Sequence, residues 1–134
     1  MKMIVVKNKI VPPSGIKALT AWPLLFVRSK YMTEQDMRHE GIHGEQQKEM
    51  LCVAVVLCVV SWLAGLGWWS LLCLPLYVWL YAALWLWAYA KTGDVDEAYK
   101  ANPLEREAYF FDGDTGYLDR RRWFAWWQFV SKFT

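Results

Sequence analysis

The feature that most constrains the fold of this chain is a long stretch without charge. From Met50 to Ala90 no residue is charged, whereas Lys48 and Glu49 precede the stretch and Lys91 follows it. About forty apolar residues are too many for one helical crossing of a ~30 Å hydrocarbon core and about enough for two. The sequence therefore predicts a mainly α integral membrane protein built on a two-helix transmembrane hairpin.

Turn-forming residues divide this stretch near its middle. Two glycines and a serine occur between Gly65 and Ser70, and these residue types favour turns. We expect spans at about 50–65 and 71–90, joined by this turn. An aromatic belt at the far interface is then formed by three tryptophans, Trp62, Trp68 and Trp69. A buried hairpin of a soluble protein is the alternative, but about ninety remaining residues are too few to enclose it.

The distribution of charge indicates how the hairpin is oriented. All 15 Lys and Arg and all 13 Asp and Glu lie outside the stretch, so a hairpin places them on one side of the bilayer. The positive-inside rule makes that side the cytoplasm. The net charge of +2 and the lack of a basic stripe argue against nucleic-acid binding. The first residues, Met1 to Lys7, lack the apolar core of a signal peptide.

A metal-binding pattern precedes the apolar stretch. His39-Glu40-Gly41-Ile42-His43 spells H-E-x-x-H and contains the only two histidines of the chain. Residues four apart share a helix face, so both imidazoles can reach one ion. The glutamate between them can act as a base on a water at the metal. The motif predicts Zn²⁺ as cofactor, with His39 and His43 as ligands and Glu40 as the catalytic base.

The motif is expected to lie on a helix that continues into the first span. Thr33 is a suitable N-cap, and Asp36 completes a variant of the capping box. No proline then follows before Pro75, so the helix is predicted over 33–65. Gln46 and Gln47 either line the site on the next turn or solvate the helix near the headgroups.

A catalytic zinc site needs a third protein ligand and an open position. The three cysteines lie inside the apolar stretch without C-x-x-C spacing, which is typical of packing residues. A carboxylate from the segment that follows the hairpin is the better candidate. Pro103 is well placed for the first turn of a helix there. Glu105 and Glu107 point to different sides of that helix, so only one of them is expected to face the metal.

These motifs together resemble the gluzincin-type zinc metallopeptidases, in which H-E-x-x-H is completed by the glutamate of E-x-x-A-D on a later helix. Residues Glu105 to Ala108 match E-x-x-A, and the resemblance implies that Glu105 is the third ligand. The chain also resembles small uncharacterised bacterial membrane proteins with R-H-E-x-I-H-x-x-Q-Q, an apolar hairpin and F-E-R-E-A-Y. The matching stretches here are Arg38 to Gln47 and Leu104 to Tyr109, and the likeness covers most of the chain.

One position departs from the peptidase pattern. Tyr109 stands where these families usually have an aspartate that braces the first zinc histidine, and such a partner orients the ring and fixes its tautomer. The departure bears on catalysis more than on metal binding. Residues expected to support the ligands or to contact a substrate are Gln47, Glu107 and Tyr109.

The flanks are expected to form smaller elements of one membrane-embedded domain over 1–134. Residues 1–31 are β-rich and predict a β-meander, with strands at Ile4–Val6, at Ile10–Val11 and within Ala18–Val27, where Pro23 marks an edge or bulge. Residues 102–134 carry the third-ligand helix and a tail. In that tail Arg120 to Trp127 joins arginines to indoles, which predicts a C-terminal interfacial amphipathic helix.

The sequence as a whole indicates a membrane-bound zinc metallopeptidase that hydrolyses peptide bonds at the cytoplasmic surface of a bacterial inner membrane. It is expected to be multi-pass, with both termini and the metal site on the cytoplasmic side. Its partners would be the lipid bilayer and a peptide or membrane-protein substrate. Two alternatives remain: a zinc-binding accessory protein without catalysis, and a metal-free two-span subunit of a membrane complex.

Overall fold

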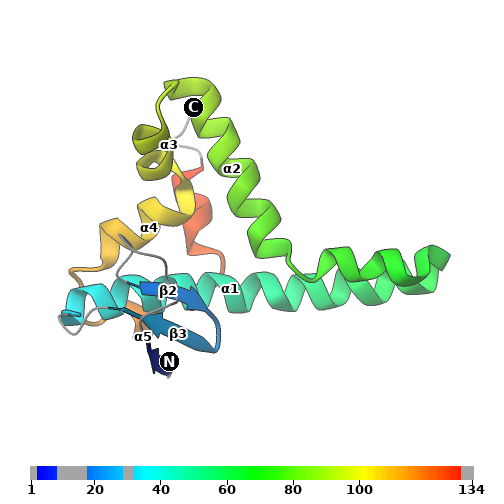
Figure 1. The fold of residues 1–134 in the computed structure, drawn as a ribbon, viewed down its shortest axis with the longest axis horizontal. Helices are drawn as coiled ribbons and strands as arrows, with labels where there is room; N and C mark the ends of the chain where they lie inside the picture. The colour runs from blue at the N-terminus through cyan, green and yellow to red at the C-terminus, as the bar shows by residue number, and fades with distance from the viewer. Residues whose placement is uncertain (1–2, 9–17, 29–31, 131–134) are drawn as a thin grey trace.

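The computed structural model describes residues 3–8, 18–28 and 32–130. Helices make up most of it, and a small sheet lies near the N-terminus (Figure 1). The strands are β1 (Ile4–Lys7), β2 (Ala18–Ala21) and β3 (Leu24–Val27). The α-helices are α1 (Glu34–Ser61), α2 (Leu76–Thr92), α3 (Val95–Ala101), α4 (Pro103–Phe111) and α5 (Tyr117–Arg120). Shorter helical segments are η1 (Trp62–Leu66), η2 (Gly67–Cys73) and η3 (Ala125–Phe129).

The predicted start of the motif helix is confirmed. The Thr33 side chain accepts a hydrogen bond from the Asp36 backbone N–H at 3.0 Å, and the Asp36 carboxylate accepts one from the Thr33 N–H at 3.1 Å. This reciprocal pair satisfies two of the N–H groups that a helix start leaves without partners. The 28 residues of α1 then pass through the H-E-x-x-H motif into the apolar stretch.

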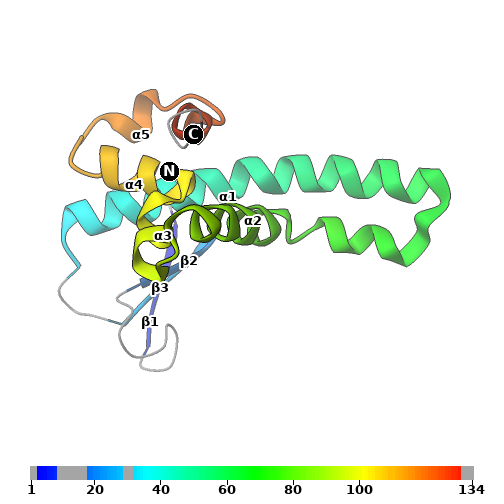
Figure 2. The ribbon, with the colours of Figure 1, turned by 90° about the horizontal axis from the view of Figure 1, so that it is seen from above.

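Beyond Met50, α1 leaves the body of the molecule and forms one side of a projection, which we call the apolar finger (residues 50–74). The chain reverses at its tip and returns as η2, which lies beside α1 (Figure 2). Gly65 and Gly67 have φ of 93° and 57°, which glycine adopts without the strain a side chain would cause. The turn predicted from these glycines is confirmed.

The second span predicted at 71–90 is not found. The returning leg is the short η2, and α2 then runs steeply away from the finger over the body (Figure 1). Pro75 separates the two segments; it lacks an N–H and its ring clashes with the preceding turn, so it interrupts a helix. Among the described residues, Glu34–Cys73 is the only helical stretch whose length and composition would allow it to cross a membrane.

Two hydrophobic clusters bring the later helices back to α1. One joins Met50, Leu104 and Trp126 with residues from the inner face of α2. The other joins Ile42, Ala108 and Tyr117 beside the motif itself. Both include a residue of α4, so this helix packs along the first half of α1. The predicted return of the acidic segment to the motif is confirmed, but it runs through α2 and α3 and not through a second span.

The sheet is not the predicted meander. Its strand order is β1-β3-β2; β1 is parallel to β3, and β2 is antiparallel to β3. The stretch Ala18–Val27 forms two strands because Pro23 lies in the turn between them, where its missing N–H costs no ladder bond. The strand predicted at Ile10–Val11 lies outside the described residues.

The predicted C-terminal amphipathic helix is also absent from the described part of the tail. The chain forms α5 and η3 instead, and Trp126 and Phe129 of η3 are buried. Arg121 explains part of the difference, because its side chain is engaged inside the protein and not at a surface. Arg120 pairs with Asp114, and the Arg121 side chain is only 3% exposed.

Candidate metal centre

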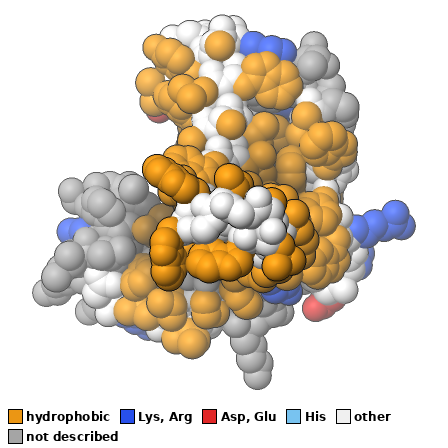
Figure 3. Space-filling view, turned by 90° about the vertical axis from the view of Figure 1, so that its right-hand side faces the viewer, with side chains coloured by type: hydrophobic (Ala, Val, Ile, Leu, Met, Phe, Trp, Pro, Cys, Tyr) orange, Lys and Arg blue, Asp and Glu red, His pale blue; other side chains and the backbone are white. Residues whose placement is uncertain are grey.

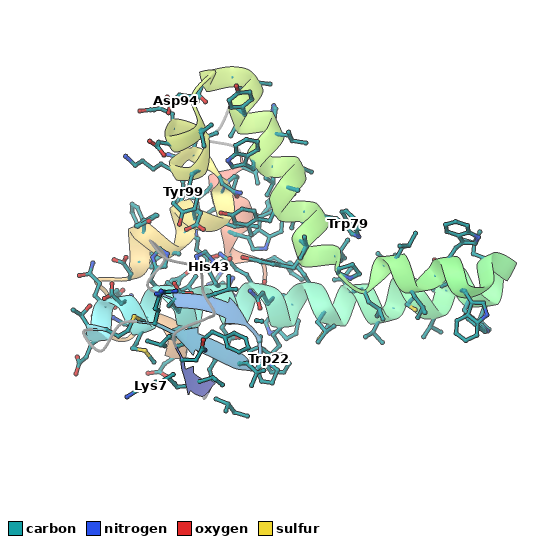
Figure 4. All side chains as sticks on the ribbon, viewed as in Figure 1. Lys7, Trp22, His43, Trp79, Asp94 and Tyr99 are labelled. Carbon is teal, nitrogen blue, oxygen red and sulfur yellow. The ribbon has the colours of Figure 1, made fainter. Side chains whose placement is uncertain are left out.

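Three predicted ligands converge where α4 crosses the first half of α1. His39 and His43 lie one turn apart on α1, and their Nε2 atoms are 3.2 Å apart. Glu105 approaches from α4, with its Oε2 3.2 Å from His43 Nε2 and 3.4 Å from His39 Nε2. His43 and Glu105 are buried, and the His39 side chain is 12% exposed. Figure 4 shows His43 where α1, the sheet and the base of α2 meet.

The partners of the other ring nitrogens fix the tautomers. His39 Nδ1 lies 3.3 Å from Asp112 Oδ2, and His43 Nδ1 lies 3.0 Å from Gln46 Oε1. Both oxygens are acceptors, so each Nδ1 carries the proton and donates. The two Nε2 lone pairs and the Glu105 carboxylate therefore point at one another. Three acceptors so close together need either a proton or a metal ion among them.

The spacing of these atoms suits a metal ion. Zinc ligands at about 2.0–2.1 Å in tetrahedral geometry are about 3.3 Å from one another, and the observed separations are 3.2–3.4 Å. His39, His43 and Glu105 could thus hold a metal ion. Two imidazoles and one carboxylate are also the ligand set of several catalytic zinc sites.

The electrostatics of the site favour positive charge. Burial alone lowers the pKa of His43, but the adjacent Glu105 carboxylate outweighs burial and raises that pKa to about 9. Burial alone raises the pKa of Glu105, but the positive charge of His43 and hydrogen bonds from both histidines hold it far below its usual range. Without a metal, a proton neutralises the cluster, so a metal ion competes with that proton for the same lone pairs.

Asp112 provides the carboxylate that holds the His39 ring, a role for which Tyr109 has no carboxylate. Besides facing His39 Nδ1, its Oδ1 accepts a hydrogen bond from Gln35 Nε2 at 2.8 Å, and its backbone carbonyl accepts one from Arg38 Nε at 2.7 Å. Asp112 follows the last residue of α4 and lies seven residues after Glu105, two turns along the same face. An aspartate thus faces His39 three residues after Tyr109, and it was not predicted from the sequence.

Replacing Asp112 with Asn is expected to weaken zinc binding about 10–100-fold, the usual effect of removing the partner of a metal-bound histidine. The amide cannot hold the His39 tautomer as a carboxylate does. Competition with a chromogenic chelator measures the affinity. Asp114→Asn is the matched control, because Asp114 pairs with Arg120 away from the site. Equal affinity of Asp112→Asn and wild type would contradict the role of the brace.

A second network supports His43 from behind. Gln46 is fully buried, and its Nε2 donates to the Leu104 carbonyl at 2.9 Å and to Glu107 Oε2 at 2.7 Å. Because both partners are acceptors, the Gln46 carbonyl oxygen must face His43. Glu107 in turn accepts hydrogen bonds from Arg121 Nε at 2.5 Å and from the Tyr117 hydroxyl at 2.8 Å. Glu107 thus acts through Gln46 and does not reach the metal position.

Arg121 joins this network to α1. It pairs with Glu107 and with Glu49, and all three side chains are nearly inaccessible to solvent. Replacing Arg121 with Met would leave two buried carboxylates without their cation. We expect the free energy of unfolding to fall by about 3–5 kcal/mol, measured by denaturant unfolding in detergent. The control is Arg122→Met, since Arg122 is exposed; equal losses for both variants would contradict the role of the buried pair.

The predicted base lies beside the metal ligands, at the edge of a cavity. Glu40 accepts a hydrogen bond from the Thr20 hydroxyl at 2.6 Å through its Oε2, so β2 orients this carboxylate. The cavity has a volume of about 570 Å³ and is bounded by α1, β2, α2 and the α3–α4 region. Its lining comprises Ala18, Leu19, Thr20, His39, Glu40, His43, Gln47, Tyr77, Val78, Tyr81, Ala82, Tyr99 and Glu105.

The remaining predicted residues have different surroundings. Gln47 is bound to the sheet: it donates to the Thr20 carbonyl and accepts from the Trp22 N–H, both at 2.7 Å. The Tyr109 ring packs edge-on against His39, with centroids 4.5 Å apart, and is half exposed. Tyr81 was not predicted, yet its hydroxyl donates to Glu105 Oε1 at 2.9 Å. In the sequence Tyr81 is one of several aromatic residues of the apolar stretch, and nothing there marks it as a partner of Glu105.

The chain matches no protein family, no curated protein and no solved structure. The geometry and chemistry of these residues therefore carry the functional argument.

Proposed function

We propose that this protein is a membrane-bound zinc metallopeptidase of the gluzincin type. The observation that carries the proposal is the convergence of two imidazole lone pairs and one carboxylate at tetrahedral spacing beside Glu40. When bound, zinc would act as a Lewis acid that lowers the pKa of a coordinated water and polarises a substrate carbonyl. The ion would be held by His39, His43 and Glu105.

Other residues of the chain have the roles of general base and of support for the ligands. Glu40 is the general base that takes a proton from the attacking water and passes it to the leaving amine. One of its oxygens accepts the Thr20 hydroxyl, which leaves the other oxygen for that proton. Asp112 and Gln46 hold the two imidazoles in the tautomer that a metal requires.

A peptide suits the cavity as substrate. β2 is an edge strand of the sheet and forms one wall of the cavity. Gln47 already binds the Thr20 carbonyl on that edge and the Trp22 N–H just beyond it. A peptide would therefore bind nearer Ala18, at the start of β2, which also lines the cavity. An extended peptide can bind such an edge through main-chain hydrogen bonds. Aliphatic and aromatic side chains from β2 and α2 would receive the apolar side chains of the substrate.

The membrane location is supported by the apolar finger. Its surface is exposed and uncharged, and it belongs to the helical stretch whose length and composition suit a membrane. Every charged side chain of the protein lies outside 50–90. We propose that the metal centre and both termini lie on the cytoplasmic side of a bacterial inner membrane, following the positive-inside rule.

The alternative of a zinc protein without catalysis rested on the missing aspartate, and Asp112 removes that reason. The alternative of a metal-free subunit would need a proton on His43 to neutralise the cluster, as its raised pKa allows, and metal analysis of the purified protein separates it from the proposal. The test is zinc-dependent hydrolysis of a fluorogenic peptide library by the protein in nanodiscs, lost with a chelator and restored by zinc. The activity must depend on Glu40. A protein that binds zinc and cleaves no peptide would instead be the accessory protein.

A further inference from the structure

The uncharged stretch is divided between two parts of the structure that face the same way. The apolar finger takes residues 50–74, and α2 takes most of the rest. Figure 3 views the molecule from the tip of the finger: hydrophobic side chains cover the tip and much of the column above it, and Lys and Arg lie toward the margins. The finger and α2 thus share one hydrophobic face.

The outer face of α2 is as apolar as its inner face. The inner residues, such as Tyr77, Leu80 and Leu84, pack against the cluster of Met50, Leu104 and Trp126. The exposed residues of α2 up to Ala90 recur at helical spacing and are Val78, Trp79, Ala82, Ala83, Leu86, Tyr89 and Ala90. Trp79 and Leu86 are 54% and 59% exposed, and Trp79 points toward the side of the finger (Figure 4). A helix of a soluble protein normally has a polar outer face.

The direction of α2 determines how this face can meet lipid. Because α2 leaves the finger steeply after Pro75, its outer residues do not descend alongside the inserted finger. Figure 1 shows that α2 slopes back over the body as it rises, so its outer residues lie at the base of the finger or further from its tip. At the end of α2, Lys91 lies 4.7 Å from the centroid of the Trp87 ring, a pairing suited to the headgroup region, where both side chain types are enriched.

We propose that one bilayer covers both parts: the apolar finger inserts into it, and α2 lies flat in the headgroup region of the same leaflet. The occupant is lipid, because an interface with a soluble protein has a polar rim, and no charged residue interrupts this surface between Met50 and Ala90. The inference rests on the proposed membrane location and replaces two spans by one inserted hairpin and one surface helix.

This arrangement restricts the substrate of the proposed peptidase. Val78 and Ala82 line the metal cavity and flank the lipid-facing side of α2. The cavity therefore opens beside the membrane surface. Its substrate class is a peptide segment that lies on the bilayer or emerges from it.

A depth profile by spin labelling tests the arrangement. Single cysteines at Ala83, Leu86 and Ala90 probe α2, and Val56→Cys probes the finger; all four sites are exposed, and the three native cysteines are replaced. The protein is placed in nanodiscs of phosphatidylcholine and phosphatidylglycerol, and collision with oxygen and with a water-soluble nickel chelate reports depth. We expect one shallow depth for the three α2 labels and a deeper position for Val56.

The other outcomes overturn the proposal in distinguishable ways. A change of about 10 Å in depth between residues 83 and 90, at ~1.5 Å per residue, would mean that α2 crosses the membrane. Labels on α2 that neither reagent reaches would mean that a protein covers it. Labels on α2 in water, with Val56 in lipid, would refute the surface helix alone.

A label at Val56 in water would refute the membrane location itself. Zinc binding by the same samples then shows whether the metal centre is present independently of the membrane location.

A second measurement keeps the native cysteines. Ala83→Lys is expected to remain in the carbonate-resistant membrane fraction at the wild-type level, because a lysine in the headgroup region keeps its ammonium in water. Val56→Lys is the matched substitution in the finger and should reduce that fraction severalfold. An equal loss for both variants would mean that residue 83 lies in the hydrocarbon core, against the proposal.

Discussion

Replacing His43 or Glu105 with alanine is expected to abolish stoichiometric zinc binding. Each substitution leaves two ligand atoms, and a tetrahedral site with two protein ligands holds zinc weakly. The loss in affinity should exceed the ~10–100-fold expected for the partners behind the ligands. Plasma mass spectrometry of the protein purified in detergent gives the metal content, and the absorption of cobalt-substituted protein reports the geometry.

The matched control for these variants is Glu45→Ala. Glu45 lies on the same helix and pairs with Lys48 at 2.8 Å, away from the ligand atoms, so its loss should leave the zinc content unchanged. A wild-type protein that takes up no zinc would refute the metal centre. If Glu105→Ala kept a full equivalent of zinc, the third ligand would be another residue, although the histidines could still bind.

Replacing Glu40 with Gln is expected to lower peptide hydrolysis by at least about 10²–10⁴-fold, the usual contribution of a general base. The amide is almost isosteric but cannot accept a proton, and Glu40 is not one of the three ligands. The zinc content should therefore stay at the wild-type level. Single-turnover cleavage of a fluorogenic peptide, together with metal analysis of the same sample, separates the chemical step from metal loss.

Glu34→Gln serves as the control for this second experiment. Glu34 lies in the first turn of the same helix, and its carboxylate is almost fully exposed beside Arg38, so the substitution changes the same charge away from the cavity. Wild-type rates for Glu40→Gln would show that another group takes the proton. A loss of zinc from Glu40→Gln would mean that Glu40 supports the ligands and would refute its assignment as a base alone.

Local features of the fold could be predicted because their causes lie within a few residues of sequence. The capping box at Thr33 and Asp36, the uninterrupted motif helix and the glycine turn at Gly65 and Gly67 each depend on near neighbours. The approach of Glu105 to the histidines was also predicted, although by a different route. Hydropathy showed that residues 50–90 are apolar and uncharged, but it did not show that the second half turns away at Pro75.

Features that depend on distant contacts could not be read from the sequence in the same way. Arg121 lies in a basic, indole-rich run that is typical of a membrane surface, yet Glu49 and Glu107 hold it inside the protein. Gln46 was open to two interpretations, and only the arrival of α4 decides that it supports His43. In each case a partner 14 to 72 residues away determines the role.

The place of Asp112 on the α4 face has a consequence for how such centres are recognised. Positions four and seven residues after a glutamate lie on the same side of a helix, so a carboxylate at either position can support the same histidine. A sequence motif that requires the aspartate four residues after the glutamate would miss this chain. A motif that accepts four or seven residues would find it. Where a small protein has a tyrosine four residues after the glutamate, the position one turn further along the helix should be checked for a carboxylate before the site is judged incomplete.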